Sequence, residues 1–295
     1  MRYPGSVAII ITLRVIDLEH TMTCRKTYVQ EIARNLSEFL ATGNVEALIA
    51  GLVAKSCLTG SHANRDLVTA FADTVKEYAA ADEGDCRILW SLCTELACVA
   101  PEDAPAGDPH EILPLCGVLG IAAIGSLSPA LTGAALTLLQ DASLDRRREV
   151  REVVALGVHD LLAARQEETV AGLEEWIESG SWLPMRAAAA GIAESELLEE
   201  PELADAALRL HRKILIRVYT AGERQSEAFV ALRKALGYTL GRVVEALPGI
   251  GFEYLRQLAA LDDHDVRWIV RENLEGETLR RRYPETVRHI QASLG

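Results

Sequence analysis

The chain has 295 residues, of which 49% are hydrophobic and 25% are charged, and its formal net charge is -13. This composition is typical of a folded protein and excludes disorder over most of the chain. The acidic balance disfavours nucleic acid as a partner, because affinity for a phosphate backbone comes mainly from Lys and Arg contacts that release counterions.

Residues 1–24 are expected to be a terminal extension, either disordered or the product of a misassigned start with Met22 as the true first residue. Their apolar run from Val7 to Leu13 is far shorter than the roughly 20 residues that a membrane helix needs. Arg14 and Asp17 interrupt the run, and no clean cleavage site of a signal peptide follows it. We therefore expect no membrane association.

Residues 25–100 are predicted to form an N-terminal helical cluster, because Ala and Leu are abundant and no alternating strand segment is bounded by hairpin turn signals. The string APEDAPAGDP at 100–109 holds three prolines and a glycine, so it is predicted to be a loop that ends this cluster. Helices in the first half of the chain are expected at about 26–41, 45–55, 64–81, 85–99, 110–125 and 129–140.

All six cysteines lie within the first 116 residues. They form no Cys-x-x-Cys pair, and a secreted domain held by disulfides is normally shorter and richer in cysteine. We therefore expect reduced, buried thiols and a cytoplasmic location.

Residues 110–295 are predicted to form stacked helix pairs. Seven stripes of apolar side chains recur in the second half of the chain at helical spacing, joined by short polar turns. One helix pair is too thin to bury its own apolar face, so neighbouring pairs must cover it. The stripes run over 150–161, 170–177, 203–218, 229–247, 252–259, 266–270 and 287–294, and the last of them is expected to cap the stack.

Three helix starts share a pattern of a polar, turn-forming stretch, an apolar residue, an Arg and a further apolar helix. They are DRRREVREVVALG around Arg151, WLPMRAAAAGIAE around Arg186 and DDHDVRWIVRENL around Arg267. The first two arginines are 35 residues apart and the last two are 81 apart, close to one and two periods of a two-helix repeat. These segments resemble HEAT repeats, whose second helix typically begins with an Asp-containing turn followed by Val-Arg. The resemblance covers about 128–280 and implies an all-α fold, a right-handed α-α superhelix of antiparallel helix pairs.

Two roles are open for Arg151, Arg186 and Arg267. An Arg in the first turn of a repeat helix commonly ties one repeat to a carboxylate or carbonyl of its neighbour. The alternative is that these arginines line the concave face and meet an acidic ligand. Ser181 and Trp182 precede Arg186 where an Asp is usual, so a ladder of Asp and Arg through all repeats is not expected.

A basic face is predicted on one helix, where Arg209, Arg212, Lys213 and Arg217 lie opposite the apolar stripe. Like charges at this spacing repel by roughly 0.2–0.5 kcal/mol per pair, so an opposite charge should offset them. The acidic segment just upstream, Glu194 to Glu202, supplies that charge in one interpretation. In the other, the face docks an acidic peptide or a phosphate backbone.

The string ALPGIGFEYL contains Gly249 and Gly251 and resembles the hairpin of helix-hairpin-helix DNA-binding modules, whose Pro-Gly-Ile-Gly turn presents backbone amides to a phosphate. It is an anion-binding turn in this interpretation and only a tight turn between two helices in the other. Glu253 and Tyr254 stand where those modules usually carry Lys or small residues.

Motifs of known enzymes are absent from the sequence. It has no His-Glu-x-x-His pair, no Cys and His spacing suited to zinc, no phosphate-binding loop and no Gly-x-Ser-x-Gly elbow, so we expect no metal and no cofactor. HEAT-like superhelices nevertheless include alkylpurine DNA glycosylases, which use aromatic and carboxylate side chains at a lesion. Trp176, Trp182 and Trp268 would be the aromatic side chains here, and the favoured alternative is that they fill gaps between helices.

The resemblance implies a non-catalytic scaffold or adaptor that binds a protein partner through the surface of the solenoid. Part of that surface is expected to be Arg209, Arg212, Lys213 and Arg217. The alternative function is nucleic-acid binding or DNA repair of the alkylpurine glycosylase type.

Overall fold

A computed structural model describes residues 25–56 and 64–294. The extension expected at 1–24 lies outside the described residues. Packing divides the chain into two compact units, Met1–Ile124 and Gly125–Gly295.

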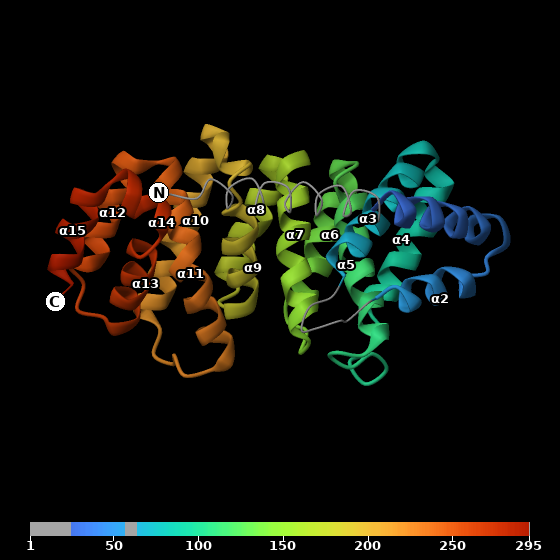
Figure 1. Ribbon diagram of the computed structural model, residues 1–295, viewed down its shortest axis with the longest axis horizontal. Helices are drawn as coiled ribbons and strands as arrows, with labels where there is room; N and C mark the ends of the chain where they lie inside the picture. Colours follow the sequence, from blue (N-terminus) through green and yellow to red (C-terminus); the bar gives the residue numbers. More distant parts are fainter. Residues whose placement is uncertain (1–24, 57–63, 295) are drawn as a thin grey trace, which may run out of the picture. The chain divides into compact units, whose positions relative to one another are not determined.

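The first unit is a helical cluster that contains the uncharged helix α5 (Ile112–Gly125). Because every face of α5 is apolar, neighbouring helices must cover it all round, and Leu115, Cys116 and Ile121 are buried. The unit also contains a helix over residues 25–42, α2 (Glu46–Ala54), α3 (Arg65–Ala81), α4 (Glu83–Ala97) and a short 3-10 turn, η1 (Pro109–Glu111), most of them labelled in Figure 1.

Polar side chains set the starts of α3 and α4. The Asn64 side-chain oxygen accepts a hydrogen bond from the Leu67 N–H at 3.1 Å, and the Asp82 carboxylate accepts one from the Asp85 N–H at 3.0 Å. Each cap satisfies an amide that has no partner within its own helix. The local sequence thus fixes where both helices begin.

The proline-rich loop at 100–109 lies inside the first unit, and the division falls after Ile124 instead. The physical reason is a close contact between α4 and α5. A Cβ added at Gly117 would lie 2.2 Å from the backbone nitrogen of Ala97, so the two helices meet at backbone distance. The loop therefore connects two helices of one core.

The second unit stacks its helices in two rows. Helices α7, α9, α11 and α13 pack side by side in one row, and α6, α8 and α10 lie in the other (Figure 1). Successive helices pack on each other through short connections, which makes them antiparallel pairs. The bounds are α6 (Pro129–Ala142), α7 (Arg148–Ala164), α8 (Gln166–Glu178), α9 (Trp182–Ile192), η2 (Leu197–Glu199), α10 (Pro201–Thr220), α11 (Glu227–Ala246), α12 (Pro248–Ala259), α13 (His264–Leu274), α14 (Glu277–Arg282) and α15 (Pro284–Ser293).

Small residues and buried polar bonds hold neighbours of one row together. A Cβ at Gly191 of α9 would lie 2.5 Å from Cγ1 of Val158 on α7, so this contact requires glycine. Asn273 of α13 donates to the Leu236 carbonyl of α11 at 2.8 Å and accepts from the Gly241 N–H at 2.5 Å. Buried amides paired in this way fix the register of α13 against α11.

Polar contacts also join one helix pair to the next at a repeated sequence distance. Lys213 on α10 donates to Glu174 on α8 at 2.8 Å, and Arg224 after α10 donates to Asp263 before α13 at 2.6 Å. Both pairs are 39 residues apart. These contacts follow the repeat and link the α10–α11 helix pair to the helix pair on each side of it.

The predicted all-α fold of stacked antiparallel helix pairs is confirmed, and the residues that the structure describes contain no strand. The six helices expected in the first half differ from the observed ones by one or two residues at their ends. The short helix α14 has no counterpart among the predicted stripes. Within 25–56 and 64–294, no helix is both long and apolar enough to cross a membrane.

Candidate functional site

A cleft of about 610 Å³ opens over the first turns of α7, α9 and α11, entirely within the second unit. Its volume falls in the roughly 300–1,000 Å³ range of ligand-binding clefts. Because α9 lies between α7 and α11, its single lining residue, Arg186, forms the floor, and the two flanking helices form the walls. We call this site the α7–α11 cleft.

The α7 side of the cleft is cationic and is formed by Arg148 and Arg151 above Arg186. Arg186 and Arg148 share one carboxylate, because both approach the same oxygen of Glu152, at 2.5 Å and 3.5 Å. Arg151 instead donates to main-chain carbonyls of the turn before α7, including that of Asp145 at 2.6 Å. Three guanidinium groups therefore face the cleft with one carboxylate among them.

Neighbouring charges alter the ionisation of this group. Burial lowers the pKa of Arg151, and repulsion from Arg186 lowers it further. Burial alone would raise the pKa of Glu152, but its hydrogen bond and charge interaction with Arg186 outweigh burial and lower it. An anion entering the cleft would relieve the repulsion between the two arginines.

The α11 wall lacks the arginine that recurs at the helix starts of the repeat. Arg151 is the fourth residue of α7, Arg186 the fifth of α9 and Arg267 the fourth of α13. In α11 these two positions hold Val230 and Ala231, which line the cleft. The interval of 81 residues between Arg186 and Arg267 skips this helix. The absence of the arginine leaves the cleft open.

Further along α11 the wall continues with Ala235 and Tyr238, and Lys234 adds a cation at the rim. Tyr238 is 49% exposed, and the guanidinium of Arg242 lies 5.9 Å from its ring centroid. Lys234 is also exposed, and no hydrogen bond or ion pair links it to another of the described residues. The α11 side thus offers apolar surface and one free cation.

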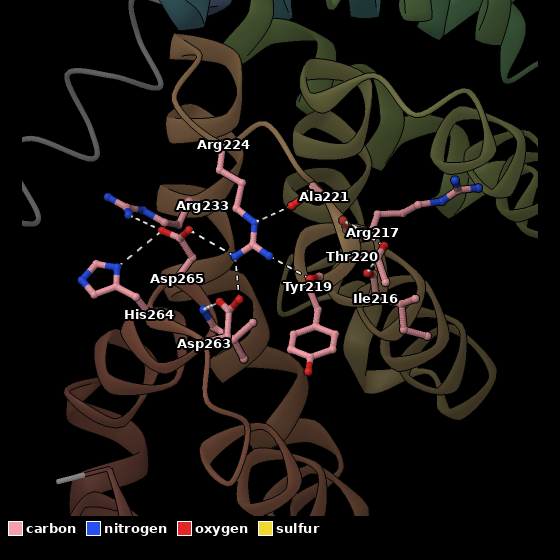
Figure 2. A network of polar contacts seen from close by, with 11 residues as sticks. Ile216, Arg217, Tyr219, Thr220, Ala221, Arg224, Arg233, Asp263, His264 and Asp265 are labelled. Carbon is pink, nitrogen blue, oxygen red and sulfur yellow. Dashed lines mark hydrogen bonds and ion pairs between the residues drawn. The ribbon is translucent and has the colours of Figure 1, made fainter.

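A polar network holds the connection that leads into α11. Figure 2 shows the Arg224 guanidinium between the carboxylates that precede and begin α13 and the main chain at the end of α10. It donates to Asp263 at 2.6 Å, to the Tyr219 carbonyl at 2.7 Å and to the Ala221 carbonyl at 3.1 Å. Asp265 also binds Arg233 of α11 at 2.5 Å. These bonds fix the loop that brings Gln225 and Glu227 to the mouth of the cleft, both of which line it.

The structure divides the four cations predicted to form one basic face. Lys213 and Arg217 form ion pairs with Glu174 and Glu178 of α8, so their charges are neutralised by the neighbouring repeat and not by the upstream segment at 194–202. Arg212 lies over the ring of Tyr254 on α12, at 5.0 Å from its centroid. Arg209 and Arg212 are both exposed and form no ion pair with another described residue, and of these two Arg209 alone also lacks a ring contact.

An exposed stripe follows Arg209 and Arg212 along α10 and ends in apolar side chains. Ile216 is 61% exposed and Tyr219 is 47% exposed. Both side chains stand away from the Arg224 network in Figure 2. This stripe is therefore a mixed basic and apolar surface on a different row from the cleft.

The string with Gly249 and Gly251 is the first turn of α12 and not a hairpin turn. Pro248 opens the helix, and its fixed φ suits that position. A Cβ at Gly251 would lie 2.9 Å from Cα of Val244, so glycine there allows α12 to approach α11. The connection between the two helices is Leu247 alone.

The remaining predicted residues lie in separate places. Arg267 pairs with Asp262 of its own turn at 3.4 Å, so among the three repeated arginines Arg186 alone is bonded to a carboxylate of the preceding helix pair. Trp176 is buried, and the Trp182 ring packs edge-on against Phe229 with centroids 5.4 Å apart. Trp268 lies under the guanidinium of Arg233 at 4.7 Å. These tryptophans are distributed along the stack.

No metal-binding group of side chains is assembled in the part of the chain that the structure describes. No three His, Cys, Asp or Glu side chains gather there in a way that could hold a metal ion. Cys93 and Cys116 are buried thiols, as expected, and burial raises the pKa of both, whereas the expectation is wrong for Cys98, which is exposed, and Cys86 is half-buried. A raised pKa keeps a thiol protonated and unreactive.

The chain matches no family model and no curated protein. Among solved structures it is similar to a designed armadillo repeat protein, at 15% sequence identity and a TM-score of 0.28, over 77% of this chain and 98% of that chain. The fold assignment rests on the helix packing described above.

Proposed function

We propose that this protein is a non-catalytic scaffold or adaptor that binds a protein partner in the α7–α11 cleft. The observation that carries the proposal is the set of three arginines on one side of an open cleft in a chain of net charge -13. Such a site favours an acidic segment of another protein, because local positive charge attracts it. We also propose that the repeat is HEAT-like and that the protein is cytoplasmic. The Asp-containing turn before Arg151 supports the HEAT-like repeat.

The α10 residues remain a second proposed surface for the same function. Arg209 and Arg212 are exposed beside Ile216 and Tyr219, so a partner could contact both charge and apolar area there. Lys213 and Arg217 contribute less, because their ion pairs with α8 must break first.

One pair of variants separates the two surfaces. Lys234→Glu reverses an exposed cation at the cleft, and Arg209→Glu reverses an exposed cation on α10; neither side chain is bonded to another described residue. We expect proteins captured from a lysate of the source organism by the native chain to be lost with Lys234→Glu and kept with Arg209→Glu. Quantitative mass spectrometry of the captured proteins measures this. The opposite pattern moves the proposal to α10, and retention of all partners by both variants contradicts it.

The nucleic-acid alternative predicts a different result. It requires retention of duplex DNA at low salt and a steep loss of affinity as salt rises. If the native chain shifts labelled duplex DNA in an electrophoretic assay and Lys234→Glu does not, the ligand of the cleft is nucleic acid and not a protein.

A further inference from the structure

We infer that the occupant of the α7–α11 cleft is an extended segment of a partner protein in which acidic and large apolar side chains alternate. This inference rests on the proposed function and names the chemistry of the ligand. It follows from the opposite character of the two walls.

The direction of the cleft comes from the helices that line it. Lining residues recur along α11 from Glu227 to Tyr238, whereas α9 contributes Arg186 alone. At a rise of roughly 1.5 Å per residue this stretch of α11 is about 17 Å long. An extended chain advances about 3.3 Å per residue, so about five residues of a ligand fit along the wall.

The walls define the side chains of that ligand. Successive side chains of an extended segment point to opposite sides. Those directed toward α7 meet Arg148 and Arg151, while those directed toward α11 meet Val230 and Tyr238, with the exposed Lys234 one helical turn from each of the two. Acidic residues suit the first set and Leu, Ile or aromatic residues the second, because guanidinium groups pair with carboxylates and exposed apolar surface gains from burial.

The carboxylates already in the cleft strengthen this alternation. Glu152 is occupied by Arg148 and Arg186, so it leaves Arg151 without a carboxylate partner at hydrogen-bond distance. Glu227 stands on the α11 side of the mouth and repels an acidic side chain directed there. An acid is therefore favoured on the α7 side and disfavoured near the start of α11.

Four fluorescent peptides of about ten residues test the inference, each long enough to exceed the five that fit along the wall. One alternates Glu and Leu, one alternates Glu and Ser, one alternates Lys and Leu, and one has the composition of the first with Glu and Leu in separate blocks. Fluorescence anisotropy with the full chain measures affinity. We expect the alternating Glu and Leu peptide to bind at least about tenfold more tightly than each of the others. Burial of one Leu accounts for that factor against the Glu–Ser peptide, the Lys–Leu peptide places cations against the arginines, and the blocked peptide cannot serve both walls along its length.

Two variants test the two walls separately, one variant for each wall. Arg148→Gln removes an exposed cation while Glu152 keeps its bond to Arg186, so both acidic alternating peptides should bind severalfold more weakly. Tyr238→Ser removes apolar surface and, of the two acidic alternating peptides, should weaken only the one with Leu. A general loss of structure would weaken both peptides in both variants, and Arg209→Glu on the other row should change neither.

The outcomes separate this inference from the proposed function. The alternating ligand is overturned if the alternating Glu–Leu peptide binds no more tightly than the Glu–Ser peptide or the blocked peptide. It is also overturned if none of the four peptides binds. The proposed function then still stands if Lys234→Glu loses the captured proteins. If Lys234→Glu and Arg209→Glu both keep them, the proposed function fails, whatever the peptides do.

Discussion

The His211 imidazole is fully buried between α10 and α11 and has a defined tautomer. One ring nitrogen lies 2.8 Å from the Ala207 carbonyl, which can only accept, so Nδ1 carries the proton. Nε2 then accepts from the Thr239 hydroxyl at 2.9 Å. Burial lowers the pKa of His211 to about 4, and the bond to the Ala207 carbonyl opposes that change only in part.

Stability should therefore fall as the solution is acidified. An unfolded His binds a proton near pH 6.5, while the folded one stays neutral down to about pH 4. The free energy of unfolding is therefore highest above pH 6.5 and declines as the pH falls from 6.5 toward 4. Between pH 7 and pH 5 the expected loss is about 2 kcal/mol. Urea unfolding of the native chain and of His211→Gln at both pH values measures it, and the variant should lose less. Equal losses in the two chains would assign the acid sensitivity to other groups.

At the scale of elements, Arg224 joins the connection after α10 to the start of α13. Four donors of one planar guanidinium are used, and a lysine amine cannot reach all of these acceptors. Arg224→Lys should therefore lower the free energy of unfolding by about 1–3 kcal/mol and loosen the loop at 221–226. Chemical denaturation and limited proteolysis of that loop test this. Arg256→Lys, at the exposed pair with Glu253, is the matched control and should have almost no effect.

Helices could be predicted from the sequence because apolar spacing is a local signal, whereas the Asp82 cap was not recognised, so α4 was expected at 85 and begins at Glu83. The ion-pair partners of Lys213 and Arg217 could not be predicted from the sequence, because Glu174 and Glu178 approach these cations only when α8 and α10 stack. Proximity in sequence pointed to the acidic segment at 194–202 instead.

The cleft was missed for a related reason. Its signal is the absence of an arginine at Val230 and Ala231, and an absence is visible only when the start of α11 is known. The Gly251 string was misassigned as a turn because glycine serves tight turns and close helix contacts equally well. Distinguishing the two requires the distance to Val244.

At the scale of the whole molecule, α15 covers apolar side chains of the helices before it. Val287 and Ile290 of α15 are buried, and α15 packs on α12 and α13. Removal of residues 284–295 should expose this surface and lower the free energy of unfolding by about 3 kcal/mol or more, since each buried aliphatic side chain contributes about 1.5–3 kcal/mol. Thermal denaturation and binding of a hydrophobic dye measure the change. Arg288→Ala in the intact chain is the control, and an unchanged melting temperature of the truncated chain would refute the capping role.

The distance of 39 residues between paired side chains such as Arg224 and Asp263 has a kinetic consequence. Closing a loop of that size costs little more entropy than closing a shorter one, because the cost grows only with the logarithm of loop length. Each helix pair can therefore gain its partners from the next pair as soon as both exist, without waiting for distant parts of the chain. During synthesis, the second unit can then acquire order one pair at a time behind the growing end of the polypeptide.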